Sequence, residues 1–75
     1  MSNEEYPFSF TYAPLISTLH IKKVSKKELQ EAIGTSSATI AKISKDQPVS
    51  MKILNDICHF LNCNIEDVIE HRKDS

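Results

Sequence analysis

The sequence lacks the features that mark several classes of protein. Its 75 residues include one glycine and no tryptophan, so a glycine-rich loop for binding phosphate groups is excluded. No apolar run approaches the roughly 20 residues that a helix needs to cross a bilayer. The N-terminus has neither the basic region nor the apolar core of a secretion signal. We therefore expect one small domain in the cytoplasm.

Motifs for catalysis are also missing. The chain has three histidines and ten acidic residues, but no nucleophile motif contains them. A domain of this size offers little concavity from which water can be excluded. We therefore expect no enzymatic activity and no cofactor.

Cysteine is scarce, since Cys58 and Cys63 are the two cysteines of the chain. Without a secretion signal they are expected to be reduced thiols. Together with His59 and His71 they raise the hypothesis of a metal site, but their spacing does not match the C-x2-C pair of a zinc knuckle. Cys58 also falls on the apolar stripe of a predicted helix, where cysteine acts as a small hydrophobic residue. We expect structural cysteines and no bound metal.

Charge is nearly balanced, at −1 overall, but it is unevenly distributed. Six lysines and two glutamates lie between His20 and Lys45, whereas the segments on either side carry more acidic than basic residues. A basic face flanked by acidic regions suits docking to a polyanion. The alternative is that the charged run is an ordinary solvated surface.

Helical periodicity predicts five helices. Their expected ranges are Ala13 to Lys22, between Ser25 and Gly34, about 36–45, from Ser50 to Leu61, and Ile65 to about Arg72. Ser25 and Glu28 form a predicted capping box, and Gly34 supplies a left-handed end. Ser36 is the predicted N-cap of the third helix, whose inner side holds Ile40 and Ile43.

The fourth predicted helix has the strongest amphipathic pattern and should lie in the core. Its inner face is predicted to comprise Met51, Leu54, Ile57, Cys58 and Leu61. Asn62 suits a left-handed exit from this helix, and Asn64 suits the cap of the fifth. That last helix should close the bundle through Ile65, Val68 and Ile69.

The second and third predicted helices are short and are joined by a turn that contains Gly34. Two such helices cross at a steep angle, and the second is presented outward. The major groove of DNA is wide enough to admit one α-helix. The arrangement therefore favours a helix-turn-helix unit that docks on DNA.

The run "SKKELQEAIGTSSATIAKISKDQPVSMKILNDICHFLNCNIEDVIE" resembles the Cro/C1-type helix-turn-helix transcriptional regulators, the xenobiotic-response-element group, and most closely their short single-domain bacterial members. The resemblance extends from Tyr12 to about Glu70. It implies an all-α, five-helix, lambda-repressor-like domain that binds operator DNA and regulates transcription, with a homodimer reading two half-sites. Its anchors are Leu29, Gly34, Ser36, Ile40, Ser50, Leu54, Ile57, Leu61 and "NCNIEDVI".

The sequence departs from the family at four positions. Gln30 and Thr35 stand where an alanine and an aliphatic residue are usual. Ser44 and Asp46 replace the acidic residue and the glycine that commonly end the third helix. These departures bear on the helix crossing and on the path of the following loop.

The resemblance implies that the helix at about 36–45 is the recognition helix and that the lysines around it contact the DNA backbone. The expected base contacts are Ser37, Ala38, Thr39, Ala41 and Lys42. The expected phosphate contacts are Lys22, Lys23, Lys26, Lys27, Ser36 and Lys45. Each lysine taken alone is also explained as a solubilising surface residue. The alternative function is a protein-interaction module, of the anti-repressor or antitoxin kind, that uses the acidic C-terminal helices.

Four of the five aromatic residues alternate in "YPFSFTY", at Tyr6, Phe8, Phe10 and Tyr12. This period predicts one face of an extended segment. It either folds back onto the bundle, or pairs with its copy on a second subunit through Tyr6, Phe8 and Phe10, or reaches DNA. The third option is weak because Glu4 and Glu5 repel phosphates. The expected organisation is an aromatic arm over 1–11, the DNA-binding domain over 12–72 and a frayed tail over 73–75.

Overall fold

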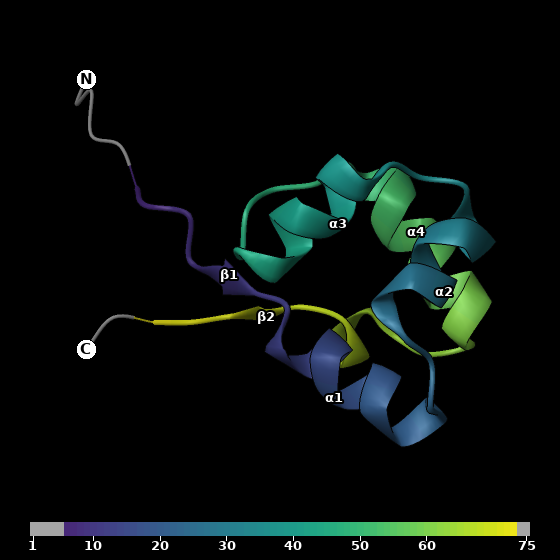
Figure 1. Ribbon diagram of the computed structural model, residues 1–75. Helices are drawn as coiled ribbons and strands as arrows, with labels where there is room; N and C mark the ends of the chain where they lie inside the picture. Colours follow the sequence, from purple (N-terminus) through teal and green to yellow (C-terminus); the bar gives the residue numbers. More distant parts are fainter. Residues whose placement is uncertain (1–5, 74–75) are drawn as a thin grey trace.

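The computed structural model describes residues 6–73, in which four α-helices and a two-stranded sheet form one body (Figure 1). Glu4, Glu5 and the end of the predicted tail lie outside these residues. The elements in chain order are β1 (Phe10–Thr11), α1 (Ala13–Lys22), α2 (Lys26–Ile33), α3 (Ser37–Ser44), α4 (Met51–Leu61), the 3-10 turn η1 (Ile65–Asp67) and β2 (Glu70–His71). Within residues 6–73, no helix combines the length and the apolar character that crossing a membrane requires.

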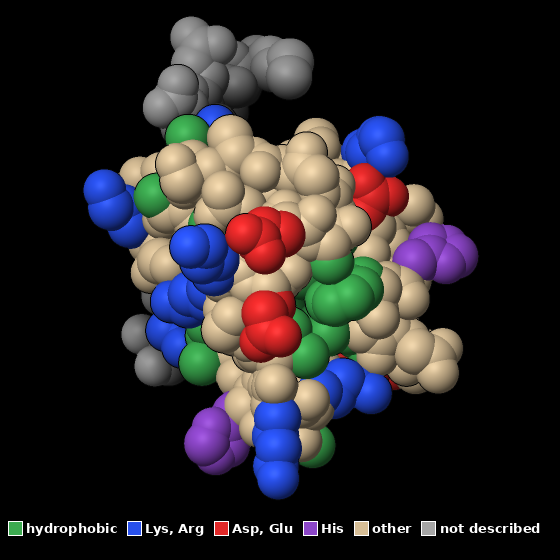
Figure 2. All heavy atoms as spheres, turned by 45° about the vertical axis from the view of Figure 1, so that its right-hand side comes forward, with side chains coloured by type: hydrophobic (Ala, Val, Ile, Leu, Met, Phe, Trp, Pro, Cys, Tyr) green, Lys and Arg blue, Asp and Glu red, His purple; other side chains and the backbone are tan. Residues whose placement is uncertain are grey.

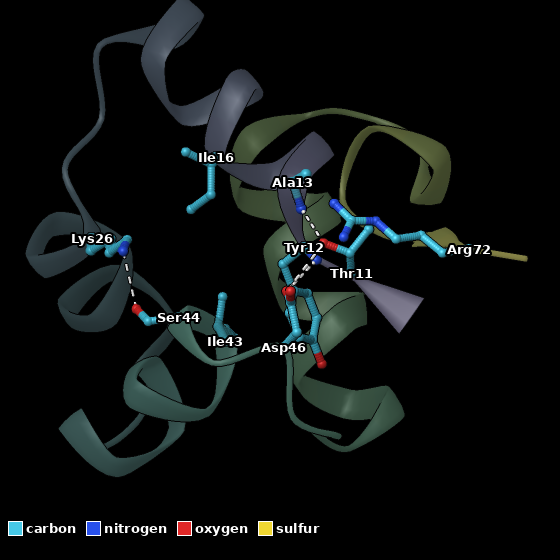
Figure 3. Close-up of a pocket in the computed structure, with 9 residues that line it drawn as sticks. All are labelled: Thr11, Tyr12, Ala13, Ile16, Lys26, Ile43, Ser44, Asp46 and Arg72. Carbon is cyan, nitrogen blue, oxygen red and sulfur yellow. Dashed lines mark hydrogen bonds between the residues drawn. The ribbon is translucent and has the colours of Figure 1, made fainter. Parts of the chain in front are cut away.

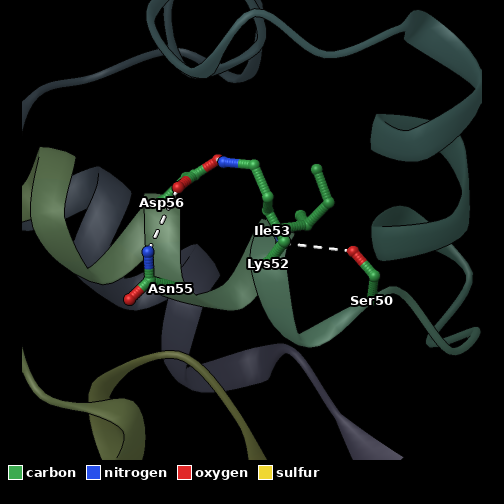
Figure 4. Close-up of polar contacts among 5 residues, drawn as sticks. All are labelled: Ser50, Lys52, Ile53, Asn55 and Asp56. Carbon is green, nitrogen blue, oxygen red and sulfur yellow. Dashed lines mark hydrogen bonds and ion pairs between the residues drawn. The ribbon is translucent and has the colours of Figure 1, made fainter.

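The helices begin and end where their local signals predict. The Ser25 hydroxyl accepts from the Glu28 N–H at 3.0 Å, and the Glu28 carboxylate accepts from the Ser25 N–H at 2.9 Å. Ser36 and Ser50 cap α3 and α4 through the same kind of bond, the second of which is drawn in Figure 4 beside the 2.9 Å ion pair of Lys52 and Asp56 on α4. Gly34 ends α2 in the left-handed conformation (φ 66°).

The core is made of apolar side chains from all four helices, from Tyr12 just before α1 and from the segment after η1. Leu15, Leu29, Ile57 and Val68 are almost completely buried. The other buried hydrophobic residues are Tyr12, Leu19, Ile40, Ile43, Leu54 and Leu61. Because α2 packs against both α3 and α4, the helix-turn-helix pair is held from its inner side.

Met51 was expected on the inner face of α4, and this prediction is wrong. Its side chain is 78% exposed, whereas Leu54, one turn later, is buried. Met51 is the first residue of α4 and lies at the rim of the core, beside Phe8 and Phe10 in a surface hollow. The apolar pattern of α4 begins at its first residue, Met51, but the buried part of the helix begins one turn later, at Leu54.

The predicted fifth helix is also wrong, because η1 gives way to the strand β2. In a continuous helix the N–H of Arg72 would bond to the carbonyl of Val68. Here the Val68 carbonyl accepts from the N–H of Leu15 in α1 at 3.2 Å, and the Arg72 N–H donates to the Ser9 carbonyl at 2.8 Å. Both groups thus have partners in the N-terminal part of the chain, and the backbone after Val68 is extended.

The N-terminal segment folds back on its own chain. β1 pairs antiparallel with β2, with Phe10 opposite His71. The ring centroids of these two residues are 5.0 Å apart, edge to face. Tyr12 is buried, its hydroxyl donates to the Gln47 carbonyl at 2.8 Å, and burial raises the pKa of its phenol. Phe8 is 47% exposed, so the alternating aromatic residues do not share one environment: Tyr12 lies in the core and Phe8 lies at the surface.

Asp46, which stands where the family that the sequence resembles commonly has glycine, connects the end of α3 to the start of α1. Its backbone is left-handed (φ 54°), a conformation that costs a residue with a side chain about 1–2 kcal/mol. Its carboxylate accepts from the Tyr12 N–H at 2.9 Å and from the Thr11 hydroxyl at 3.2 Å. Thr11 in turn accepts from the Ala13 N–H at 3.2 Å. The carboxylate therefore caps α1 from a distant part of the chain.

Substitution of Asp46 tests this cap. We expect Asp46→Ala to lower the free energy of unfolding by about 2 kcal/mol, since the hydrogen bonds are lost while the left-handed strain stays. Asp46→Gly should cost about 1 kcal/mol less than Asp46→Ala because glycine adopts this conformation without strain. Urea denaturation followed by circular dichroism measures both values. Equal losses for the two variants would contradict this account of the backbone.

Candidate nucleic-acid interface

α3 presents a small, polar outer surface and is anchored by two isoleucines. Ile40 and Ile43 are buried against the core. The residues predicted to contact bases are all on this helix, and most of them are exposed. Ser37, Ala38, Ala41 and Lys42 are exposed, whereas Thr39 is half-buried, with its hydroxyl 3.4 Å from that of Ser36. The outward side of α3 is therefore free to enter a groove, with one cation and several short side chains.

Ser36 stands at the N-terminus of α3, as predicted. Its hydroxyl accepts from the Thr39 N–H at 3.3 Å, and its side chain is exposed. Within residues 6–73, the N–H groups of Ser37 and Ala38 have no backbone or side-chain acceptor. The unpaired amides at the start of a helix and the helix dipole both favour an anion at this position.

Lys26 joins the two helices of the motif at their other end. Its Nζ donates to the Ser44 hydroxyl at 3.0 Å, so the first turn of α2 is connected to the last turn of α3 (Figure 3). Lys27 is next to it on α2, Lys45 follows α3, and Lys23 lies in the turn before α2; all three are exposed. The structure thus places these four lysines on or next to the motif helices.

Lys22 is placed differently from the other predicted phosphate contacts. It lines a surface hollow with Cys63 and Asp67, between the end of α1 and the turn after α4. This hollow is formed by neither α2 nor α3. Lys22 is therefore the member of the predicted set with the least support from the structure.

The basic residues do not cover a whole face. Figure 2 shows Lys and Arg side chains mainly toward the left and lower edges of the face in view, with others apart from them at the right, and acidic and hydrophobic side chains near the centre. Attraction for a polyanion is therefore strongest along an edge. Exposed charges of this kind act within about one Debye length, roughly 10 Å at 0.1 M salt.

Arg72 is a residue whose position could not be foreseen from the sequence. It belongs to the acidic C-terminal third and was assigned to a helix, but β2 brings it to the same surface hollow as Lys26 and Asp46. The hollow has a volume of about 270 Å³ and lies between the starts of α1 and α2, the end of α3 and β2. The one feature of the sequence that pointed to this position of Arg72 was the strand-like aromatic segment, which contains β1, the partner of β2.

The cysteines pack as small hydrophobic residues. Both are half-buried free thiols beside the core, and they flank the end of α4, where the Cys63 N–H donates to the Cys58 carbonyl at 3.0 Å. Burial raises the pKa of the Cys63 thiol, which disfavours the thiolate that metals bind. In the part of the chain that the structure describes, no three His, Cys, Asp or Glu side chains form a group that could hold a metal ion.

Comparison with known proteins agrees with this geometry. Residues 15–74 match the model of the Cro/C1-type HTH DNA-binding domain. Among solved structures, the chain is similar to the crystal structure of the transcriptional regulator VanUg in form II, with a TM-score of 0.86 and 35% sequence identity over 99% of this chain and 100% of that one. Comparison with curated proteins gives no match. Because the structural alignment covers nearly the whole chain, it includes β1 and β2 as well as the motif.

Proposed function

The chain belongs to the Cro/C1-type helix-turn-helix DNA-binding family, and on this premise we propose that it is a sequence-specific transcriptional regulator with α3 as its recognition helix in the major groove. The observation that carries the proposal is the two-sided character of α3. Ile40 and Ile43 are buried, while the opposite side exposes short side chains and Lys42. A helix anchored in this way turns its exposed side chains outward, as a helix that reads base edges in the major groove must do.

The proposed base contacts follow from side-chain chemistry. Lys42 can donate to the O6 and N7 acceptors of guanine, and Ala38 and Ala41 offer apolar contact to a thymine methyl group. Ser37 and Thr39 can bond either to a base or to the backbone. Because these side chains are small, direct readout is modest, and we propose that the shape of the DNA and the spacing of half-sites add to specificity.

We assign the phosphate contacts to Ser36 and to the lysines around the motif. Lys26 is the central one because its position in the first turn of α2 is fixed by Ser44. Lys23, Lys27 and Lys45 are the other exposed lysines on or next to the motif helices. These contacts set affinity and its salt dependence and carry little sequence information. Lys22 stays in the predicted set but should contribute least, given its place beside Asp67.

A salt titration of DNA binding tests these roles. Duplexes that the purified protein retains from a random pool supply the operator, and its dissociation constant is measured at several salt concentrations. Lys26→Ala should weaken binding to operator and to unrelated duplex alike and reduce the salt slope by about 1. Lys42→Ala should cost about 1–3 kcal/mol at the operator and less on unrelated duplex.

Lys22→Ala is the matched control for this titration, since it removes the same charge from a different surface. Its effect on the salt slope should be clearly smaller than that of Lys26→Ala. Equal effects would show that net charge, and not the motif, sets affinity. If the wild-type protein binds no duplex at any salt concentration, the DNA-binding proposal fails, and the alternative of a protein-interaction module gains support.

We propose that the protein acts as a homodimer, because a single motif of this kind reads only one half-site. Tyr6, Phe8 and Phe10 remain the candidates for the dimer contact, and they are 83%, 47% and 39% exposed. Phe8 and Phe10 also line an apolar surface hollow of about 190 Å³ with Met51, which is 78% exposed. Association of two such surfaces would remove these side chains from water, at a gain of about 25 cal/mol per Å² of apolar area.

Phe8→Glu tests the dimer contact without removing β1. A buried charge without a partner is costly, so we expect the variant to shift from dimer to monomer, measured by analytical ultracentrifugation across a concentration series. Its melting temperature at low concentration should stay within a few degrees of the wild type, because Phe8 lies outside the core. Ile21→Glu is the control, since Ile21 is 77% exposed on α1. If the Phe8→Glu protein dimerises like the wild type, the proposal that this surface forms the dimer contact is wrong.

Under this proposal the protein is a non-enzymatic regulator that works on DNA in the cytoplasm and needs no metal or cofactor. The competing interaction module was based on an acidic surface of the fourth and fifth helices. Since η1 and β2 replace the fifth helix, that surface is reduced to α4 and the short segments after it. No feature of the described residues favours it over DNA binding.

A further inference from the structure

A surface hollow beside the motif carries a positively charged group at each end (Figure 3). At one end is Lys26, whose Nζ is held by the Ser44 hydroxyl at 3.0 Å. At the other end is Arg72, which extends from the segment after β2 toward Thr11. The hollow thus joins the end of α3 and the first turn of α2, which belong to the motif, to a C-terminal residue outside it.

Arg72 is held in this position by main-chain pairing. Its N–H donates to the Ser9 carbonyl at 2.8 Å, directly after the pairing of His71 with Phe10. The backbone under the side chain is therefore fixed, while the side chain itself is exposed. Among residues 6–73 the ion pair found is that of Lys52 and Asp56, so the Arg72 guanidinium has no carboxylate partner there.

Asp46 is the acidic residue that lines the hollow, and it opposes an anion there. Its Oδ1 is already bonded to the Tyr12 N–H and the Thr11 hydroxyl, so the carboxylate faces the positive end of α1. The two cations therefore outnumber one acid whose charge is partly offset by the helix end. With a volume of about 270 Å³ the hollow has room for a phosphate group and some water.

We propose that this hollow binds the phosphate backbone of DNA and that Arg72 is a phosphate contact supplied from outside the helix-turn-helix motif. The inference rests on the proposed function, since it requires α3 to lie in the major groove. The hollow adjoins the last turn of α3, so a strand whose bases meet this helix passes near Lys26 and Arg72. A guanidinium matches phosphate oxygens with two parallel N–H donors, which a lysine cannot do.

The first experiment compares Arg72→Ala with Lys73→Ala, which removes the same charge one residue further on, from a side chain that does not line the hollow. Binding to the selected duplex is measured against salt. For Arg72→Ala we expect the slope of log K against log salt to fall by about 0.9 and binding near 0.1 M salt to weaken roughly tenfold. Lys73→Ala should produce less than half of either change. The affinity of Arg72→Lys for DNA should lie between those of Arg72→Ala and the wild type, because lysine keeps the positive charge but lacks the two parallel N–H donors of the guanidinium.

The outcomes separate the two proposals. If the wild type binds DNA and Arg72→Ala binds it with an unchanged slope, the hollow is not a phosphate site, although the regulator proposal stands. If Arg72→Ala and Lys73→Ala lose equal DNA affinity, the effect of Arg72 is general attraction between a charged tail and DNA, and the proposal of a phosphate site in the hollow is wrong. If the wild type binds no duplex, the proposed function itself has failed, and this site falls with it. Thermal melts followed by circular dichroism should show equal stability for the variants, since the Arg72 side chain is exposed.

A gain-of-binding variant completes the test, because a loss of folding cannot imitate it. Asp46→Asn removes the negative charge from the hollow, while its amide oxygen can still accept from the Tyr12 N–H and asparagine tolerates the left-handed backbone. We expect binding to tighten roughly threefold at 0.1 M salt, as removal of one charge at a distance of about 7 Å from a phosphate implies. An unchanged or weaker affinity in a folded Asp46→Asn protein would refute a phosphate at this site.

Discussion

The N–H groups at the start of α1 impose the constraint on which the rest of the structure depends. A helix leaves its first amides without partners inside the helix, and in this chain they lie against the core. Pro14 has no N–H, but Tyr12, Ala13 and Leu15 each need an acceptor. They find it in the Asp46 carboxylate, the Thr11 hydroxyl and the Val68 carbonyl. Two of these acceptors belong to parts of the chain more than thirty residues away, so the cap of α1 draws three segments together.

The two long-range bonds, to Asp46 and to Val68, each determine a feature of the candidate interface. The bond to Asp46 holds the chain just after α3 against the start of α1, and Tyr12 adds a second link there through its hydroxyl and the Gln47 carbonyl. The helix α3 is thereby held at its C-terminal end, while Ile40 and Ile43 hold its inner side. The bond to Val68 occupies the carbonyl that a fifth helix would have used. The strand that follows brings Arg72 to the motif.

The parts of the fold that could be predicted are those with a local cause. The boundaries of α2 and α4 and the start of α3 follow from short-range signals such as the Ser25 and Glu28 capping box and the left-handed residue Gly34. The inner and outer sides of α3 follow from its period, and the resemblance to the Cro/C1-type family marked this helix as the expected recognition helix, so candidate base contacts could be named on its outer side. The fifth helix was wrong because Val68 and Arg72 bond to distant residues, and no local pattern contains that information. Arg72 was missed for the same reason, since its place depends on the pairing of two strands at opposite ends of the chain.

The same pairing gives the aromatic segment two connected roles. Phe8, just before β1, and Phe10 in β1 are exposed at the surface, where we propose that a second copy binds, and the Ser9 carbonyl between them fixes the backbone of Arg72. Burial of Phe8 and Phe10 between two copies would restrain β1 and hence β2. Under the two proposals, this further restraint of the paired strands would lower the entropy that the Arg72 side chain loses when it meets a phosphate, so dimerisation and backbone binding would favour each other. In a domain of this size, with few apolar residues to spare, the proposed dimer contact and the proposed phosphate contact together give the exposed aromatic residues of this segment a role.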